Sequence, residues 1–254
     1  MPRISTESSR HNLPHFCTTL NYQRFLKDSW YFMKSKIIVI EGLDGSGKAT
    51  QTKILAEKLE SRGLKVRKLE FPDYSNPSSA LVKMYLGGEF GSKPEDVNAY
   101  AASAFYAVDR VASYMQFWKK DYQDGTVILS DRYATSNIIY QMAKVEDSQR
   151  EQFIEWQADF EYKKLGLPEA DAVIYLDVDP DVSQKLMEQR YQGDNSKKDL
   201  HESNLKFLLS CRKSALYAAE KCGWLIVNCC RDGEIRTIEE IAADIEKIVN
   251  EILC

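Results

Sequence analysis

The chain has 254 residues, of which 44% are hydrophobic and 28% charged, with 12 glycines and 7 prolines. This length and composition suit one large α/β domain with an ordinary core, and they exclude a disulfide-stabilised miniprotein and a wholly disordered chain. The formal net charge of −4 gives no overall positive field, so we expect no nucleic acid polymer as partner and only a local anion site.

Apolar runs in this chain are no longer than strands, for example residues 172–176, whereas a membrane-spanning helix needs roughly 18 consecutive apolar residues. The 6 cysteines form no C-x-x-C pair, and the 3 histidines are too scattered to complete a zinc site. We therefore expect a soluble, cytoplasmic protein with reduced thiols and no membrane partner.

Residues 1–32 differ in composition from the rest, because they carry arginines, serines and threonines without a helical or strand period. They lack the apolar segment of a signal peptide, and Glu7 and Asp28 are untypical of a transit peptide. We expect an N-terminal extension, disordered or arising from a mis-assigned start, before one domain over residues 33–254. A natural start at Met33 is one hypothesis, and an intact Met1 terminus in mass spectrometry of the native protein would contradict it.

From Lys36 onward, short apolar runs alternate with longer amphipathic ones, which predicts βαβ units around a parallel sheet with right-handed crossovers. The first run, KIIVIE, is almost entirely apolar, as expected of a central strand buried on both faces. Strands are expected at residues 36–41, 66–71, 127–130, 172–177 and 224–228. Helices are expected from 48 to the glycine at 63 and over 94–119, 149–164, 180–190, 202–221 and 237–252. The polar segment 192–200 is expected to be a mobile loop.

A G-x-x-x-x-G-K sequence, GLDGSGK at residues 42–48, lies between the first expected strand and the first expected helix. Glycines allow successive backbone N–H groups to point at a phosphate, the helix N-terminus adds its positive end, and Lys48 neutralises charge on the outer phosphates. The alternative is a glycine-rich turn without a ligand. The expected nucleotide-binding residues are Gly42, Leu43, Asp44, Gly45, Ser46, Gly47, Lys48, Ala49 and Thr50.

Ala49 departs from this motif, which has Ser or Thr after the lysine to ligate Mg²⁺. Thr50 cannot simply replace that hydroxyl, because one helical residue rotates a side chain by roughly 100°. We therefore expect Mg²⁺ to be held mainly by nucleotide oxygens, waters and a carboxylate.

Asp131 and Arg132 follow the third expected strand, at the carboxyl edge where an open parallel sheet binds its ligands. Asp131 could hold Mg²⁺ through water, and Arg132 could bridge two phosphates and stabilise the charge that develops in phosphoryl transfer. The alternative is a capping aspartate beside a solvent-exposed arginine. Further upstream, Arg110 lies on an expected helix rich in aromatic residues, a stripe that is more often core than binding site.

Four segments within residues 36–250 together resemble the thymidylate kinase family of P-loop nucleoside monophosphate kinases. They are IEGLDGSGKATQ at 40–51, FP at 71–72, YAVDR ending at 110 and DRYATSNIIYQ at 131–141. The resemblance implies an α/β, P-loop NTPase-type three-layer fold with a five-stranded parallel sheet in the order 2-3-1-4-5, flanking helices and a mobile lid. It also implies transfer of the γ-phosphoryl group of ATP to dTMP, giving dTDP and ADP, with Mg²⁺ as cofactor.

The resemblance further implies a role for each matching side chain in the acceptor pocket. Tyr106 matches the aromatic residue that stacks on thymine, and Arg110 matches the arginine that hydrogen-bonds the base carbonyl. Asn137 falls where the family contacts the pyrimidine, and Tyr140 where an aromatic edge disfavours a ribose 2′-hydroxyl. The implied substrate-binding residues, the first two of which shape the base pocket, are Phe71, Pro72, Tyr106, Arg110, Arg132, Asn137 and Tyr140.

The segment at about 190–200 matches the family's lid, which closes over ATP and excludes water. Family members with an arginine after the P-loop acid need no lid arginine, but here that position is Gly45. We therefore expect the catalytic cation from the lid, with Arg190 as first candidate before Lys197 and Lys198, and a solvent-exposed basic loop as the alternative.

Two acidic residues, Asp199 and Glu202, match acids at the end of the family's lid, and Asp44 matches the P-loop acid near the acceptor sugar and phosphate. The implied catalytic residues are Lys48, Arg132, Asp44 and Arg190, with Mg²⁺ at Asp131 through water.

Tyr74 stands where the family often has an arginine that grips the dTMP phosphate, so this role would fall to Arg132 with help from Lys83. An acceptor other than dTMP therefore stays open: dUMP, another pyrimidine nucleotide or a deoxynucleoside. Ala49 leaves open a non-catalytic nucleotide-binding protein. The expected partners are the small-molecule substrates ATP and dTMP. The family commonly forms homodimers, for which the apolar helix at 99–118 could serve, but a monomer would bury the same stripe in its own core.

Overall fold

The computed structural model describes residues 35–190, 194, 199–202 and 204–253. The expected N-terminal extension and most of the expected lid, including Lys197 and Lys198, lie outside these residues. The backbone of Arg190 is described as the last residue of a helix, but its side chain is not.

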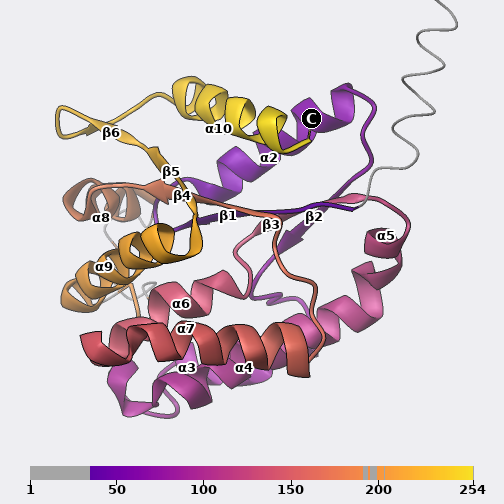
Figure 1. Cartoon of the computed structure of the whole chain (residues 1–254). Coiled ribbons are helices and arrows are strands. Elements are labelled where there is room, and N and C mark those ends of the chain that lie inside the picture. Colours follow the sequence, from indigo (N-terminus) through magenta and orange to yellow (C-terminus); the bar gives the residue numbers. More distant parts are fainter. Residues whose placement is uncertain (1–34, 191–193, 195–198, 203, 254) are drawn as a thin grey trace, which may run out of the picture. The chain divides into compact units, whose positions relative to one another are not determined.

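Five parallel strands form the central sheet in the order β2-β3-β1-β4-β5, which confirms the expected order (Figure 1). Each expected strand is present to within one residue at either end. The strands are β1 (Ile37–Gly42), β2 (Val66–Glu70), β3 (Val127–Asp131), β4 (Ala172–Asp177) and β5 (Leu225–Asn228).

The central strand β1 is buried along its whole length, because β3 and β4 flank it and helices cover both faces. Its register sets Ile40 opposite Asp131 of β3 and Gly42 opposite Leu176 of β4. The phosphate loop that follows Gly42 and the turn that follows Asp131 therefore leave the sheet side by side, at its carboxyl edge.

Helices cover both faces of the sheet and complete three layers, which confirms the expected fold class. Figure 1 shows α2 and α10 over one face and α4, α6, α7 and α9 over the other. The helices are α2 (Lys48–Ser61), α3 (Ala80–Leu86), α4 (Ala99–Ser113), α5 (Lys119–Gln123), α6 (Thr135–Tyr140), α7 (Arg150–Ala158), α8 (Pro180–Arg190), α9 (Leu205–Cys222) and α10 (Ile238–Leu253).

The prediction of a single helix at 94–119 is wrong, because this stretch forms several elements. A 3₁₀ turn over Pro94–Asp96 is followed by extended Val97, and α4 starts only after Asn98, whose side chain accepts a hydrogen bond from the Ala101 N–H. A π-helical turn over Tyr114–Trp118 then separates α4 from α5. Likewise, the helix expected at 149–164 is α7 continued by a π-helical turn, Asp159–Lys164.

Three short elements were not expected: α3, α6 and a hairpin of β6 (Cys230–Arg231) with β7 (Glu234–Ile235). Each has seven residues or fewer, too few to establish a hydrophobic period. The helix expected at 202–221 begins at Leu205 instead, because Asn204 caps it by accepting a hydrogen bond from the Phe207 N–H.

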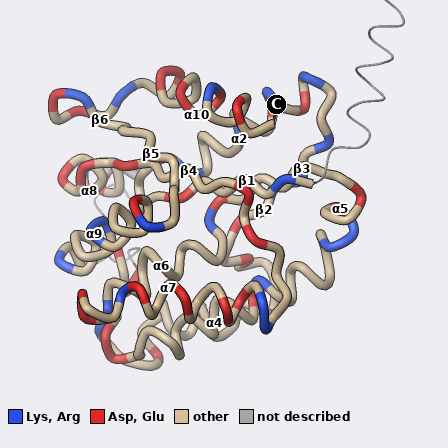
Figure 2. The backbone as a smooth tube through the Cα atoms, viewed as in Figure 1, with Lys and Arg blue, Asp and Glu red and all other residues tan. Residues whose placement is uncertain are grey.

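Charged residues of both signs are interspersed over the described elements, and Figure 2 shows no single face occupied by lysine and arginine alone. Among the described residues, no helix has both the length and the apolar character required to cross a membrane.

Candidate active site

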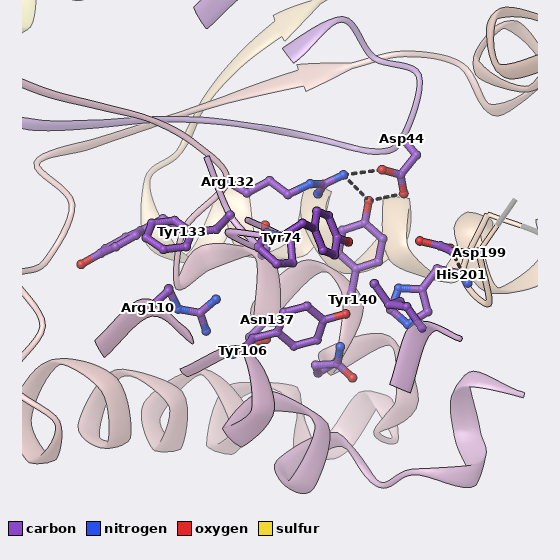
Figure 3. Close-up of a pocket in the computed structure, with 15 residues that line it drawn as sticks. Asp44, Tyr74, Tyr106, Arg110, Arg132, Tyr133, Asn137, Tyr140, Asp199 and His201 are labelled. Carbon is purple, nitrogen blue, oxygen red and sulfur yellow. Dashed lines mark hydrogen bonds and ion pairs between the residues drawn. The ribbon is translucent and has the colours of Figure 1, made fainter. Parts of the chain in front are cut away.

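Two adjoining pockets open at the carboxyl edge of the sheet. The empty volume is about 490 Å³ for the smaller and about 1790 Å³ for the larger, in both cases with space that is open to solvent. Both are lined by the same six residues where they meet, and the smaller one is drawn in Figure 3. The shared residues are Asp44, Phe71, Pro72, Tyr74, Arg132 and Asp199. Two small molecules bound in the two pockets would therefore come into contact there.

The phosphate loop runs from Gly42 into α2 and lines the larger pocket. Gly45 and Gly47 have φ angles of 78° and 83°, a region that other residues avoid. A Cβ atom at Gly45 would also lie 3.0 Å from both Met187 Cγ and the Ser183 carbonyl oxygen of α8. The Ser183 hydroxyl donates a hydrogen bond of 2.6 Å to the Asp44 carbonyl. Helix α8 thus packs directly on the loop and leaves no room for an arginine at position 45.

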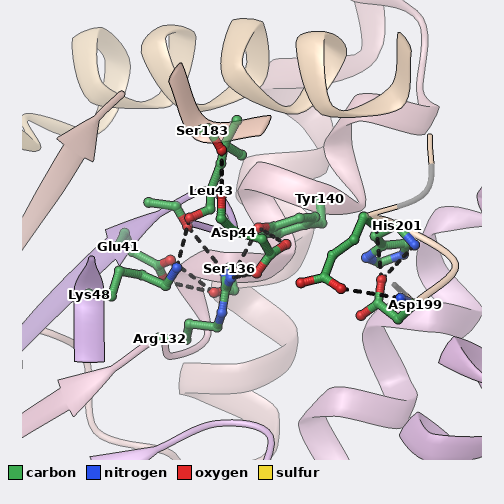
Figure 4. Close-up of polar contacts among 12 residues, drawn as sticks. Glu41, Leu43, Asp44, Lys48, Arg132, Ser136, Tyr140, Ser183, Asp199 and His201 are labelled. Carbon is green, nitrogen blue, oxygen red and sulfur yellow. Dashed lines mark hydrogen bonds and ion pairs between the residues drawn. The ribbon is translucent and has the colours of Figure 1, made fainter. Parts of the chain in front are cut away.

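Lys48 curls back over the loop, and its Nζ donates a hydrogen bond of 2.8 Å to the Leu43 carbonyl (Figure 4). Burial, followed by the nearby positive charge of Arg132, lowers the pKa of Lys48 to about 8. Within the described residues its only hydrogen bond goes to an uncharged carbonyl. An anionic phosphate in the larger pocket would be a stronger partner for this ammonium group.

Arg132, Asp44 and Tyr140 form one polar cluster where the pockets meet (Figures 3 and 4). Arg132 Nη2 lies 2.5 Å from Asp44 Oδ1 and donates to the Tyr140 hydroxyl at 3.1 Å, while that hydroxyl donates to Asp44 Oδ2 at 3.0 Å. Burial alone would raise the pKa of Asp44, but Arg132 and Lys48 outweigh it, so the pKa lies below its usual value. The carboxylate is thus ionised and neutralises Arg132.

Glu41, which the sequence analysis did not single out, anchors the turn that carries Arg132. Its carboxylate is fully buried and accepts hydrogen bonds from the Tyr133 N–H, the Thr135 hydroxyl and the Ser136 hydroxyl. Burial raises the pKa of Glu41, an effect that Arg132 and the two hydroxyls partly offset. Since Arg132 has a φ angle of 64°, its backbone needs such support to hold a sparsely populated conformation.

The opposite end of the smaller pocket is lined by Tyr106, Arg110 and Asn137, as expected for a base site (Figure 3). The Tyr106 ring meets the Tyr85 ring edge to face at 6.4 Å between centroids. Arg110 and Asn137 both bind the buried carboxylate of Glu161, which the sequence analysis missed.

A third group that the sequence analysis missed, His201, lies beside Tyr140. The His201 ring stacks on the Tyr140 ring at 5.4 Å with an interplanar angle of 13°. Its Nε2 lies 2.9 Å from the Tyr85 hydroxyl, to which Lys144 Nζ donates at 2.7 Å. Burial lowers the pKa of His201 to about 3, so the ring is neutral at ordinary pH.

Tyr74 and Lys83, the remaining expected residues, differ in their position relative to the two pockets. Tyr74 lines both and is half exposed, with 49% of its surface accessible. Lys83 is exposed on α3 and is not among the lining residues of either pocket, so its help in binding a phosphate stays a prediction. The sequence analysis missed further lining residues of the larger pocket, which come from β7, the link after it and the start of α10: Ile235, Arg236, Ile238 and Ile241.

Asp131 offers a carboxylate that suits magnesium. Among the described residues, no cluster of three or more His, Cys, Asp or Glu side chains could hold a metal. The Asp131 carboxylate lines the larger pocket beside Lys48 and takes part in no hydrogen bond or ion pair with another described residue. An oxygen ligand of this kind fits Mg²⁺, which keeps most of its waters and binds through one or two carboxylates and substrate phosphates.

Comparisons with known proteins agree with this geometry. Residues 40–240 match the family model described as thymidylate kinase. The thymidylate kinase of Mycobacterium tuberculosis is 30% identical over 201 residues, covering 76% of this chain and 91% of the relative. That of Plasmodium falciparum is 27% identical, covering 86% and 91%. Among solved structures, the thymidylate kinase of Candida albicans has a TM-score of 0.62 at 24% identity and covers 86% of this chain and 92% of its own, a similarity of fold.

Proposed function

The chain belongs to the thymidylate kinase family and is a phosphotransferase that uses ATP and acts on dTMP; we propose that its larger pocket binds Mg·ATP and its smaller pocket dTMP. The γ-phosphoryl group then passes to the 5′-phosphate of dTMP, giving dTDP and ADP. The observation that carries this proposal is the junction of the two pockets at Asp44, Tyr74 and Arg132. Direct transfer requires donor and acceptor phosphates to meet in line at one point.

In the larger pocket, the phosphate loop binds the donor. Its backbone N–H groups and the N-terminus of α2 surround the phosphates, and Lys48 exchanges the Leu43 carbonyl for a phosphate oxygen. Asp131 would hold Mg²⁺ through water, and the ion would supply neutralisation of the donor's phosphate charge. The apolar side chains Ile235 and Ile238, which line the same pocket, cover the adenine.

In the smaller pocket, Tyr106 stacks on the thymine while Arg110 and Asn137 hydrogen-bond its edge. Tyr140 packs against the deoxyribose at the position of a ribose 2′-hydroxyl. Phe71 and Pro72 close the pocket around the base. All of these residues line one cavity, although they lie up to 69 positions apart in the sequence, from Phe71 to Tyr140. This shared lining supports the assignments.

At the junction, Arg132 bridges donor and acceptor phosphates and stabilises the charge on the transferring group. Its present partner, Asp44, turns to the acceptor sugar when phosphates take its place. Gly45 supplies no arginine after Asp44, so Arg190 at the end of α8 supplies the positive charge that Lys48 and Arg132 do not.

We also propose a homodimer and a cytoplasmic location. Exposed apolar side chains on α4 and the π-helical turn after it support the dimer: Tyr100, Val108, Met115 and Phe117. Sedimentation tests the dimer, since Val108→Asp is expected to convert a dimer to a monomer. A wild type that sediments as a monomer contradicts the proposal.

The proposed cytoplasmic location is supported by the described cysteines, which are unpaired, as in a reducing compartment. Microscopy of a tagged full chain tests the location.

The decisive experiment measures ADP release with Mg·ATP and each of dTMP, dUMP, dCMP, UMP, CMP and thymidine. We expect dTMP to have the highest kcat/KM. A higher value for another acceptor would support the alternative raised by Tyr74, a kinase with a shifted acceptor. Binding of ATP without turnover of any acceptor would instead support the non-catalytic alternative raised by Ala49.

A further inference from the structure

Glu161 is a fully buried carboxylate in the π-helical turn after α7, and it does not line the smaller pocket. Its Oε2 accepts from Arg110 Nε at 2.7 Å, and its Oε1 accepts from Arg110 Nη2 at 2.5 Å. The same Oε1 accepts from Asn137 Nδ2 and Gln157 Nε2, both at 2.9 Å. A buried charge is stable only with such partners, and Arg110 supplies the opposite charge.

The Glu161 carboxylate determines which way the Asn137 amide points. An ionised carboxylate can only accept hydrogen bonds, so the NH₂ group of Asn137 must face it. The second hydrogen of that NH₂ group goes to the Ser103 carbonyl at 3.3 Å, another group that only accepts. The Asn137 carbonyl oxygen is therefore left for a ligand and acts as a hydrogen-bond acceptor.

Glu161 determines the free edge of Arg110 in the same way. The carboxylate occupies Nε and Nη2, which is the two-pronged geometry typical of arginine with a carboxylate. Among the described residues, Nη1 has no hydrogen-bond partner, and Arg110 lines the smaller pocket. The pocket is thus offered a donor from Arg110 and an acceptor from Asn137.

This pair of groups complements one kind of pyrimidine edge. Thymine and uracil present an acceptor at O4 and a donor at N3–H, whereas cytosine presents an amino donor at C4 and an acceptor at N3. Cytosine would therefore face a donor with its donor and an acceptor with its acceptor. A site built around buried hydrogen bonds discriminates strongly against a ligand that leaves them unmade.

We propose that Glu161 is a positioning residue that sets the preference for 4-oxo over 4-amino pyrimidine monophosphates, by fixing the orientation of Arg110 and Asn137 without touching the base. The inference rests on the proposed function. It assigns the discrimination to a side chain outside the pocket.

The test compares kcat/KM for dTMP, dUMP and dCMP in wild type and Glu161→Gln. A glutamine presents one NH₂ group to its neighbours, which allows the Asn137 amide to turn over and offer a donor to the pocket. We expect the dTMP:dCMP ratio to fall at least about 10-fold. The dTMP:dUMP ratio should stay within about 2-fold of its wild-type value, because both 4-oxo bases lose the same contacts. The KM for ATP should not change, because ATP binds in the larger pocket.

Gln157→Met is the matched control, because it removes one donor from the same carboxylate but leaves Arg110 and Asn137 bound to it. Its dTMP:dCMP ratio should remain that of the wild type. If Glu161→Gln fails to fold, the same ratio is measured in Glu161→Asp. The shorter side chain keeps the negative charge beside Arg110 but cannot reach both Arg110 and Asn137. A uniform loss of activity with an unchanged dTMP:dCMP ratio would overturn the inference. A wild type that does not phosphorylate dTMP would instead overturn the proposed function.

Discussion

At the base end of the smaller pocket the polar side chains are held from outside the cavity, whereas at the phosphate end, where the two pockets meet, they are held by one another or by the phosphate loop. Arg110 and Asn137 bind Glu161, which lies behind the pocket wall, and their free atoms face the ligand. Arg132 and Asp44 bind each other, and Lys48 binds a loop carbonyl. A base can therefore bind at the first end without displacing a partner, but a phosphate at the second end must replace one.

This difference separates recognition from chemistry. Groups fixed before binding discriminate between ligands, because a mismatched ligand leaves them unpaired. Groups that exchange partners gain their strongest contacts only when phosphates are present, and such contacts can be strongest in the transition state. Substitutions at the two ends should therefore change different kinetic constants.

The largest effect is expected for Lys48→Met. Loss of this cation removes stabilisation of phosphate charge, so kcat should fall by about 10³-fold or more. The dTMP:dCMP preference should survive in the residual activity or in binding, because the base end is untouched. Steady-state kinetics together with dTMP binding by calorimetry check both statements, and a lost preference would mean that the two ends are not independent.

Tyr106→Ala is expected to affect binding instead. Stacking of a base on an aromatic ring contributes about 1–3 kcal/mol, so KM for dTMP should rise roughly 10- to 100-fold while kcat changes little. Tyr106→Phe keeps the ring and should stay within about 3-fold of wild type. A fall in kcat of Tyr106→Ala as large as that of Lys48→Met would contradict the comparison.

Gly45→Ala tests the packing of α8 on the phosphate loop. A side chain at φ 78° is strained, and its Cβ would also meet Met187 and Ser183, so we expect a loss of about 2–3 kcal/mol in the free energy of unfolding. Gly63→Ala is the control, since the φ angle is also positive there, at 84°, but an added Cβ would have no atom within 4 Å. This substitution should lower the free energy of unfolding by about 1 kcal/mol. Urea denaturation measures both, and equal losses would show that the contact with α8 is loose.

A smaller effect concerns His201, whose pKa burial lowers to about 3. Between about pH 3 and about pH 6.5, the usual pKa of histidine, the unfolded chain binds a proton that the native state does not. This group therefore makes the free energy of unfolding rise with pH across the window. In His201→Phe that rise should be smaller, by on the order of 2 kcal/mol between pH 5 and 7. Identical slopes in urea denaturation would mean that the imidazole is accessible to water.

The sheet and the phosphate loop could be predicted because their signals are local. The apolar run of β1 and the glycines that follow it are contiguous in sequence, and strands form within one residue of the expected bounds. The residues that line the base end were predicted through the family resemblance, which rests on segments with recognisable patterns.

The supporting residues could not be predicted, since they act over long sequence separations. Glu161 is 51 residues from Arg110 and 24 from Asn137, and within the segment DFEYKK nothing distinguishes it from a surface acid. The pairing of His201 with Tyr85 spans 116 residues. Lys83 has a plausible charge for a phosphate contact, but it is not among the lining residues of either pocket, so its role stays a prediction.

The most direct test of the account follows the phosphoryl group itself. ATP labelled with ¹⁸O in its γ-phosphoryl group is incubated with dTMP, Mg²⁺ and the purified full chain, and the products are resolved by mass spectrometry. The account predicts that the label appears in the terminal phosphate of dTDP, because donor and acceptor meet at Arg132. Label released as inorganic phosphate, with dTMP left unchanged, would contradict it.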